Sequence, residues 1–444
     1  MLVLYKGIKF MNQMKSTFKR ILITALAVLL LAAGLMSCAG RGKTLMKMGS
    51  TTLSVNAYQL ILTRMKGELA RSLGTQVSTG SFWNTTIGKD GRTWNDYYTS
   101  LAIDTAKSYL VALYLYEKNN LTLSDSAISA VEKEMEGLLV GDGDGSKSQL
   151  NQILSAYGVN YDILKDIYLS EQKIAQLKAY LYGANAEQIA SNVKNEYMKE
   201  NYLCFRQIFM ASYYYVYEQD AYGNKVYYSS NGKSYLYDTE NGVTKNDANG
   251  QTIKDKYGNP IYYDAEGKIL YDTENGTPVR AQDSNGNYKT EDYKEEDLLK
   301  IEQNIELLAS QITDGDFKDF EDLMKEYSED EEGMTEYKNG YFLEKNTSYG
   351  YQYLNDISAA LAEMKVGETK LIESDYGYHL IMKYDCEDGA YEDKDNEIWF
   401  KDFNSLLIEF MFLQETKKYT DQIEIDKELL GSLDMKSVSH NYYY

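Results

Sequence analysis

The stretch from Asp375 to Lys383 reads Asp-Tyr-Gly-Tyr-His-Leu-Ile-Met-Lys, a turn followed by an apolar strand that carries one imidazole. His379 is one of two histidines in 444 residues, and the other, His440, lies in the polar C-terminal tail. A single histidine on an apolar strand is more often a packing residue than a functional one. The interpretation of His379 therefore depends on the motifs that accompany it.

Three motifs precede this strand. Residues 320–330 read Phe-Glu-Asp-Leu-Met-Lys-Glu-Tyr-Ser-Glu-Asp, residues 339–342 read Asn-Gly-Tyr-Phe, and residues 364–369 read Met-Lys-Val-Gly-Glu-Thr. Together with the strand that carries His379, their order resembles that of the parvulin family of peptidyl-prolyl isomerases. Each motif alone is a weak signal, but four in this order over about 65 residues are a strong one.

The resemblance implies a polar catalytic cluster formed by Gln207, Asp330 and His379. Asp330 follows Ser328 by two residues, where parvulins place an Asp or a Cys near the substrate carbonyl. Gln207 lies on a predicted strand, residues 203–210, in the position of the first of the family's two facing histidines. A glutamine can donate and accept hydrogen bonds, but it carries no charge and has no tautomers. A hydrogen-bond network is expected here, and it can serve catalysis or structure alone.

The resemblance also implies an apolar pocket that holds the prolyl ring of the substrate. The Met and Phe that form this pocket in parvulins fall on Tyr353 and Ile357. Phe342 and Leu361 are expected as core or rim residues of the same pocket. These four residues are the predicted substrate-binding positions.

The composition is that of a globular protein of about two or three domains. Apolar residues make up 43% of the chain, and Tyr is abundant at 43 residues while Pro occurs only twice. Lys and Arg number 46 against 67 Asp and Glu, which gives a formal net charge of −21. Nucleic-acid binding needs a basic face for phosphate contacts, so this balance argues against a nucleic-acid partner.

The N-terminus has the features of a bacterial lipoprotein signal peptide. Basic residues precede an apolar segment, residues 21–31, that is too short for a comfortable membrane span. Residues 35–38 read Leu-Met-Ser-Cys and resemble a lipobox, in which the Cys is diacylated and becomes the first mature residue. Residues 1–37 are therefore predicted to be removed, and Cys38 to anchor the chain in a lipid bilayer. An ordinary export signal with an incidental Cys is the alternative.

Apolar residues recur at helical spacing through residues 38–200. A small hairpin at residues 48–58 leads into the first helix, and residues 74–95 are expected to form a loop. Ser124 and Asn160 are expected to cap the starts of two further helices. Helices are also expected at residues 95–118 and 186–200. The order resembles the N-terminal chaperone domain of SurA-type and PrsA-type foldases, and a generic helical bundle is the alternative.

Residues 211–294 interrupt the parvulin pattern with an internal repeat. Tyr-Gly-Asn at residues 222–224 recurs at 257–259, and Leu-Tyr-Asp-Thr-Glu-Asn-Gly at residues 236–242 recurs at 270–276. Alternating tyrosines with Asn-Gly and Glu-Gly turns predict short β-hairpins. The aromatic surface can bind a glycan or a polypeptide, and the alternative is a solvated insertion that decorates the domain.

Beyond the insertion, the parvulin pattern runs to about residue 390, and a last helix is expected to begin at residue 398. In the resembled foldases this C-terminal segment, residues 395–444, packs on the N-terminal helices. The predicted fold class is therefore α+β. It combines a discontinuous all-helical chaperone domain with a parvulin-like domain of antiparallel sheet and helices, residues 201–390, that carries the hairpin insertion.

Other chemistry has little support in the sequence. Cys204 and Cys386 remain beside Cys38, and a disulfide between them is left open because their offset predicts poor geometry. Neither Cys has metal-ligand spacing to a His, so no metal site is expected. No phosphate-binding or dinucleotide fingerprint occurs, and no cofactor is expected.

These patterns predict a membrane-anchored foldase on the extracytoplasmic face that assists the folding of exported proteins. Its partners would be unfolded or newly exported polypeptides and, through Cys38, a lipid bilayer. Peptidyl-prolyl cis-trans isomerase activity is the first hypothesis, because Asp330 and His379 are present. A non-catalytic holdase is the second, and a surface glycan- or polypeptide-binding lipoprotein that acts through residues 211–294 is the third.

Overall fold

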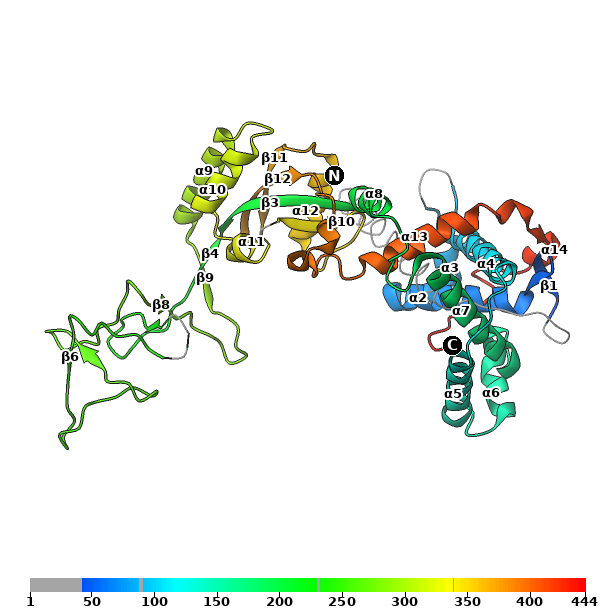
Figure 1. Cartoon of the computed structure of the whole chain (residues 1–444), viewed down its shortest axis with the longest axis horizontal. Helices are drawn as coiled ribbons and strands as arrows, with labels where there is room; N and C mark the ends of the chain where they lie inside the picture. The colour runs from blue at the N-terminus through cyan, green and yellow to red at the C-terminus, as the bar shows by residue number, and fades with distance from the viewer. Residues whose placement is uncertain (1–41, 88–90, 230–231, 233, 338) are drawn as a thin grey trace. The chain divides into compact units, whose positions relative to one another are not determined.

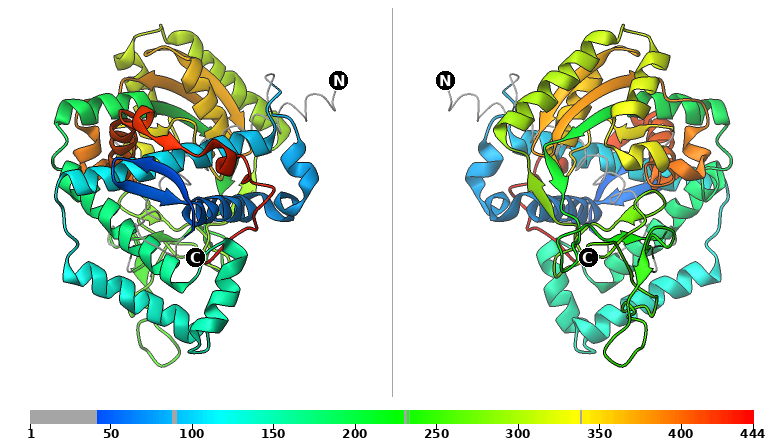
Figure 2. Two further views of the ribbon diagram at one scale, coloured as in Figure 1. Left: turned by 90° about the vertical axis from the view of Figure 1, so that its right-hand side faces the viewer. Right: turned by 90° about the vertical axis from the view of Figure 1, so that its left-hand side faces the viewer.

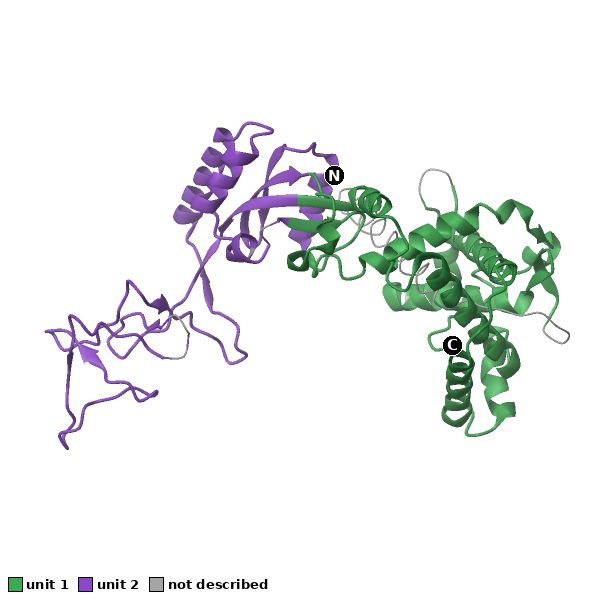
Figure 3. Cartoon of the chain, viewed as in Figure 1, with its two compact units in different colours: residues 1–204, 341–350, 385–444 green, residues 205–340, 351–384 purple. Residues whose placement is uncertain are grey.

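The computed structural model describes residues 42–87, 91–229, 232, 234–337 and 339–444. The predicted signal peptide and Cys38 lie outside these residues. The chain forms two compact units, shown in different colours in Figure 3. The first is built from residues up to Cys204, residues 341–350 and residues 385–444, and the second from residues 205–340 and 351–384. Within the described residues, no helix combines the length and hydrophobicity needed to cross a bilayer.

The first unit is mostly helical and contains both ends of the described chain. A three-stranded sheet of order β13-β1-β2 joins the ends, because Met46 of β1 pairs with Ile425 of β13. The C-terminal residues thus complete the fold that the N-terminal hairpin begins. The elements, most of which are labelled in Figure 1, are β1 (Thr44–Met48), β2 (Thr51–Ser54), α2 (Val55–Leu73), α4 (Trp94–Lys118), α5 (Asp125–Gly141), α6 (Lys147–Leu154), α7 (Tyr161–Tyr182), α8 (Ser191–Asn201), α13 (Phe403–Lys417), β13 (Glu424–Ile425) and α14 (Lys427–Leu430).

Side-chain caps fix where these helices start. The Ser124 side chain accepts a hydrogen bond from the amide of Ala127, and the Asn160 side chain accepts one from Ile163. Both expected caps are confirmed. Thr93 and Asp96 form a reciprocal capping box at the start of α4. Each cap satisfies a backbone donor that the first turn of a helix leaves unpaired.

The core of the first unit gathers side chains from α2, α4, α5, α6 and α7 together with Phe412 of α13. Two ion pairs cross this core between segments distant in sequence, Arg64 with Glu171 at 2.7 Å and Lys178 with Glu409. Burial lowers the pKa of Lys178 and raises that of Glu409, and the opposite charge of each partner counteracts this effect. The second pair therefore links α13 to α7 through charges that neither helix can leave unpaired.

Three expected boundaries were wrong. Residues 74–95 contain a 3-10 turn (Gly74–Ser78) and a short helix, α3 (Gly80–Asn84), because the buried Trp83 indole donates to the Val77 carbonyl at 2.8 Å. Helix α8 begins at Ser191 rather than 186, since Ala186 has a left-handed φ of 60°. Helix α13 begins at Phe403 rather than 398, after two 3-10 turns at residues 390–396.

The second unit is organised around strands β3, β12 and β11, which are neighbours in this order in a four-stranded sheet. Strand β3 runs from the first unit into the second, and β11 pairs antiparallel with β12, with Ile372 opposite His379. In Figure 2, helices α9 and α10 lie across one face of β11 and β12. The elements are β3 (Tyr202–Ala211), α9 (Glu295–Gln311), α10 (Phe317–Tyr327), α11 (Glu331–Thr335), α12 (Gln352–Glu363), β11 (Thr369–Ser374) and β12 (Gly377–Tyr384). The fourth strand of the sheet, β10 (Tyr341–Glu344), is counted with the first unit. The predicted α+β fold class is confirmed, and the exact domain boundaries stay predictions.

Strand alternation divides the side chains of this sheet between two faces. On one face, Ile208 of β3 and Leu380 and Met382 of β12 pack into a core with α9 and α10. The helices contribute Ile305, Leu308, Phe320 and Met324 to this core. The residues between these strand positions, including Gln207 and His379, project to the other face, where α12 lies against β11.

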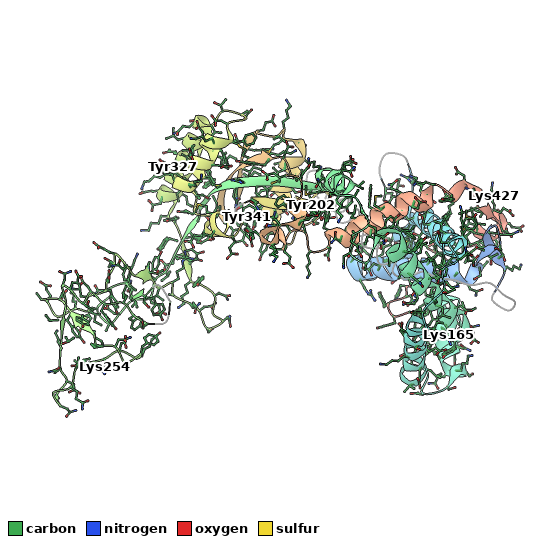
Figure 4. The ribbon with its side chains drawn as sticks, viewed as in Figure 1. Lys165, Tyr202, Lys254, Tyr327, Tyr341 and Lys427 are labelled. Carbon is green, nitrogen blue, oxygen red and sulfur yellow. The ribbon has the colours of Figure 1, made fainter. Side chains whose placement is uncertain are left out.

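The insertion hangs from the end of β3 on a two-stranded stem. Strand β4 (Tyr213–Tyr215) pairs with β9 (Thr290–Asp292), and the pairs β5 (Tyr227–Tyr228) with β8 (Thr277–Pro278) and β6 (Val243–Thr244) with β7 (Tyr262–Tyr263) follow. Single bridges such as Lys254 with Pro260 close tight hairpins between these pairs, and Figure 4 labels Lys254. The hairpin character predicted for the repeats is confirmed.

One turn recurs at four places in the insertion and accounts for the Tyr-Gly-Asn repeat. The side chains of Asp220, Asp247, Asp255 and Asp283 each accept hydrogen bonds from the amides two and four residues ahead. The residue three positions after each Asp is a Gly with φ between 80° and 89°. An L-residue with a side chain avoids this backbone region, so the Asp and the Gly recur together.

Gly377 of β12 lies against the backbone at the end of β3, and replacing it should destabilise the second unit. It has a φ of 139°, and an added Cβ would lie 2.1 Å from the Met210 carbonyl oxygen. We expect Gly377→Ala to lower the free energy of unfolding by about 2–4 kcal/mol. Urea unfolding followed by circular dichroism measures this change.

The matched control is Gly286→Ala, since Gly286 has a φ of 88° but nothing within 4 Å of an added Cβ. Its cost should be about 1 kcal/mol, from the backbone conformation alone. Equal losses in the two variants would contradict a steric role for Gly377.

Candidate functional site

His379 lies in the middle of β12 on the sheet face opposite the α9–α10 core. Its side chain is 3% exposed. The Phe209 ring lies 4.8 Å from the imidazole, and the Tyr353 ring stacks on it at 5.2 Å with an interplanar angle of 7°. The imidazole is therefore held between two aromatic rings, and only its two nitrogens are left for polar contacts.

Three of the predicted residues form one hydrogen-bonded chain. Gln207 Nε2 donates to Asp330 Oδ2 at 2.7 Å, and Gln207 Oε1 lies 2.9 Å from His379 Nδ1. Gln207 and Asp330 are half-buried, whereas His379 is buried. The structure thus brings together the whole polar cluster that the sequence predicts, from a strand, a helix end and a second strand. Its catalytic role stays a prediction.

This chain assigns the tautomer of His379. A carboxylate only accepts hydrogen bonds, so Asp330 requires the amide nitrogen of Gln207 on its side. Gln207 then presents its carbonyl oxygen to Nδ1, which must carry the proton. Nε2 is left as an acceptor, and the Ser374 hydroxyl lies 2.9 Å from it. The hydrogen bonds are therefore donated in one direction along the chain. His379 donates to Gln207, Gln207 donates to Asp330, and Nε2 of His379 faces the Ser374 hydroxyl as an acceptor.

The turn after α10 positions Asp330 against β3. The Ser328 hydroxyl accepts hydrogen bonds from the amides of Phe209 at 3.0 Å and Asp330 at 3.3 Å. The Glu329 amide donates to the Phe209 carbonyl, and its carboxylate accepts from the amide of Ala211 at 2.7 Å. Asp330 Oδ1 accepts from Gly333 at the start of α11. The Tyr-Ser-Glu-Asp motif thus serves as a clamp that fixes the carboxylate beside Gln207.

The electrostatics of the site keep the imidazole neutral. Burial lowers the pKa of His379 from 6.5 to about 4, because the charged form loses its hydration, and the charge of Asp330 opposes this effect only in part. A neutral imidazole agrees with the tautomer that the hydrogen bonds require. His379 is therefore suited to orient Gln207 rather than to transfer protons near neutral pH.

The four predicted pocket residues lie in different surroundings. Tyr353, at the start of α12, stacks on His379 as described. Ile357 and Leu361 lie one and two turns further along α12 and are 0% exposed, so they pack the helix onto the sheet rather than face solvent. Phe342 belongs to the first unit, where it is buried and packs on Phe400 at 4.9 Å. Substrate contact by Ile357, Leu361 or Phe342 would need a rearrangement of these cores.

The structure adds residues that the sequence did not indicate. Tyr351 and Tyr376 are 58% and 43% exposed and join Tyr353 in a cluster with ring centroids 5.6–6.2 Å apart. Ser374 reaches His379 because it lies opposite Gly377 in the β11–β12 hairpin. The hairpin turn at residues 375–376 was visible in the sequence, and pairing across it was the available signal for Ser374.

Cys204 and Cys386 are both buried and are not joined by a disulfide. They lie in the first unit. The bridge that the sequence left open is not formed.

Comparison with known proteins identifies the domain. Residues 288–385 match the family model of the rotamase PPIC-type PPIase domain. This part of the chain is a parvulin-type domain. The match includes Asp330 and His379, and it starts near the end of the insertion, so Gln207 on β3 precedes it. In the structure, β3 is the neighbour of β12 in the sheet, although residues 211–294 separate β3 from the matched elements in the sequence.

Solved structures of PrsA foldases are similar to the chain at low identity. PrsA from Bacillus subtilis is 18% identical, with 78% of this chain and 96% of that chain covered and a TM-score of 0.20. PrsA from Bacillus cereus is 16% identical, with 78% and 94% covered and a TM-score of 0.22. The foldase protein PrsA from Lactococcus lactis is 10% identical, with 88% and 97% covered and a TM-score of 0.20. No curated protein matches the chain.

The lowered pKa of His379 predicts how the stability of the parvulin domain depends on pH. The folded-state pKa of about 4 lies below the unfolded value of 6.5, so between these values the unfolded chain binds more protons. Stability should therefore fall as pH decreases from 6.5 towards 4, by about 3 kcal/mol from this residue alone. Hydrogen exchange of the β12 amides from pH 7 to pH 4 measures the change.

Carboxylates also titrate in this pH range, so the contribution of His379 is isolated by comparing variants. His379→Gln should lose this part of the pH dependence, whereas His440→Gln, in the C-terminal tail, should keep it. The same pH dependence in the wild type and in His379→Gln would show that His379 is not held neutral by the fold.

Proposed function

We propose that the chain is an extracytoplasmic foldase whose parvulin domain catalyses cis-trans isomerisation of Xaa-Pro bonds in exported polypeptides. The observation that carries the proposal is the hydrogen-bonded chain from Asp330 through Gln207 to His379, in a domain that matches the PPIC-type PPIase family. The similarity to PrsA foldases agrees with it but is too distant to decide it.

Prolyl isomerisation breaks no covalent bond. The barrier of roughly 18–20 kcal/mol comes from the loss of amide resonance on rotation about the C–N bond. In the twisted state the carbonyl oxygen loses negative charge, and the lone pair of the prolyl nitrogen becomes available to a donor. Groups that favour this charge distribution over the planar one lower the barrier, because only differential stabilisation accelerates the reaction.

Gln207 and Asp330 are placed to supply such groups. The Gln207 amide has two N–H bonds, and one of them goes to Asp330. The second can donate to the prolyl nitrogen in the twisted state. The Asp330 carboxylate disfavours the negative carbonyl oxygen of the planar state when the substrate lies beside it. His379 holds the Gln207 carbonyl and so acts as a positioning residue.

The exposed tyrosine cluster of Tyr351, Tyr353 and Tyr376 is the proposed binding surface for the prolyl ring. Tyr353 stands where the resemblance places one of the two apolar pocket residues of the family, and its ring stacks on the imidazole. Aromatic rings give a large apolar contact with few rotatable bonds.

The cellular site is proposed from the sequence alone. The apolar segment at residues 21–31 and Cys38 in the Leu-Met-Ser-Cys motif support export followed by diacylation. The folded units would then remain in the aqueous phase at the membrane surface, where newly exported polypeptides are their clients. The helical first unit is proposed to hold such clients, as the resemblance to SurA-type and PrsA-type domains implies.

Removing either end of the hydrogen-bonded chain should abolish most of the isomerase activity. We expect kcat/KM on short Xaa-Pro peptides to fall about tenfold or more in Asp330→Ala and in His379→Ala. A protease-coupled isomerisation assay with a panel of Xaa residues measures this. Asp314→Ala, an exposed position before α10, is the control and should leave the rate unchanged.

If no peptide isomerises faster than the uncatalysed background, the catalytic proposal is contradicted. If such a protein still suppressed aggregation of unfolded clients, the parvulin domain would serve as a binding platform in a holdase. The replacement of the family's first histidine by Gln207 makes this the second candidate.

The role assigned to Gln207 predicts different activities for two substitutions of this residue that are similar in size. Gln207→Leu removes both hydrogen bonds and leaves His379 Nδ1 and Asp330 without this partner, so we expect about a tenfold loss of kcat/KM. Gln207→His restores a residue that can donate and accept, and should keep the rate within about threefold. Equal activity in Gln207→Leu and the wild type would show that the chain of hydrogen bonds is only structural.

A further inference from the structure

The insertion contains a cleft of about 640 Å³ that plays no part in the site described above. This volume is in the range of about 300–1,000 Å³ that is usual for ligand sites in proteins. The rings of three tyrosines line it, together with one proline and one ion pair. These residues are Tyr217, Tyr228, Tyr288, Pro278, Arg280 and Glu331.

Arg280 organises the wall of the cleft. Its guanidinium carbon lies 3.9 Å from the centroid of the Tyr215 ring and 5.6 Å from that of Tyr288. The same guanidinium binds the Glu331 carboxylate at 2.6 Å. The guanidinium of Arg280 is thus paired with Glu331 and packed on aromatic rings. The rings of three tyrosines are available to a ligand beside the polar side chains of Glu218, Ser229, Thr277 and Gln282. Tyr288 is 54% exposed and provides most accessible ring area.

Two observations place the insertion and its cleft near the isomerase site. Glu331, which closes the cleft, is the residue after Asp330 of the hydrogen-bonded chain. At the root of the insertion, the Ser212 amide donates to the Tyr376 carbonyl at 2.9 Å, and Tyr376 belongs to the exposed tyrosine cluster. An extended chain advances about 3.3 Å per residue, so a client at Asp330 reaches the rim of the cleft within a few residues.

We propose that this cleft is a second binding site for the same extended, proline-containing polypeptide whose Xaa-Pro bond lies at Asp330 and Gln207. The inference rests on the proposed function, and it assigns to the Tyr-rich insertion the selection of long clients over short ones. One chain that occupies both sites binds more tightly than either site alone allows, because the second contact is intramolecular.

The chemistry of the cleft fits such a polypeptide. Proline-rich segments adopt an extended helix without internal hydrogen bonds, and aromatic-lined grooves bind it at low entropic cost. The rings of Tyr217, Tyr228 and Tyr288 supply this kind of surface. An unfolded client varies in sequence, and aromatic contacts tolerate this variation better than a fixed set of polar partners does. A polypeptide is therefore favoured over a glycan by the position of the cleft beside a peptide-isomerising site.

The test compares a short peptide with one Xaa-Pro bond and an unstructured peptide of about 20 residues that carries the same bond at its centre, flanked by prolines. The variant is Tyr288→Ser in the full mature chain. The matched control is Tyr222→Ser, because Tyr222 is 56% exposed in the same insertion but does not line the cleft. Binding is measured by fluorescence anisotropy, and isomerisation by the coupled assay and by exchange spectroscopy.

We expect Tyr288→Ser to weaken binding of the long peptide about tenfold and to lower its kcat/KM by a similar factor. Isomerisation of the short peptide should stay within about twofold of the wild type, and Tyr222→Ser should change neither. Equal effects of the two variants on the long peptide would overturn the proposal.

Soluble peptidoglycan fragments provide the other arm of the test. Their binding, if it depended on Tyr288 and did not compete with the long peptide, would assign the cleft to a glycan and overturn the proposal. Failure of the isomerase proposal is recognised separately. In that case the short peptide shows no catalysed rate, while binding of the long peptide still weakens in Tyr288→Ser.

Discussion

The hydrogen bond between Gln207 and His379, 2.9 Å long, is the constraint on which the site depends. Asp330 fixes which end of the Gln207 amide faces the imidazole, and Gln207 in turn fixes the position of the imidazole proton. Burial keeps the ring neutral, so this order of donors and acceptors persists across the physiological pH range. Gln207 thus orients the imidazole through its amide group alone, without charge or tautomers.

The sheet makes this arrangement compatible with a stable core. Alternation along β3 and β12 sends Ile208, Leu380 and Met382 into the core with α9 and α10, while Gln207 and His379 project to the opposite face. A shift of one residue in either strand would bury the polar chain in the core. Gly377 permits the close approach that holds the register, and the Ser328–Asp330 turn docks on the backbone of β3. Fold and site therefore depend on the same pairing.

Much of this could be predicted from the sequence, because it is encoded in local motifs. The strand around His379, the helix end at Asp330 and the caps at Ser124 and Asn160 all follow from short patterns. The parts that sequence reasoning missed are set by tertiary geometry. Ser374 is a site residue only through the hairpin register, and Tyr351 meets Tyr376 across segments distant in sequence. The starts of α8 and α13 were misplaced because a left-handed Ala186 and two 3-10 turns override helical spacing.

The most direct test of the central claim is the ¹⁵N spectrum of the imidazole groups, since the chain contains only His379 and His440. The structure predicts that His379 is the neutral Nδ1–H tautomer from pH 8 down to about pH 5, and that Gln207→Leu disturbs this state. His440 serves as an internal reference in the same spectrum. An Nε2–H tautomer, or titration of His379 near its ordinary pKa of about 6.5, would contradict the assignment of Gln207 as the residue that orients the imidazole.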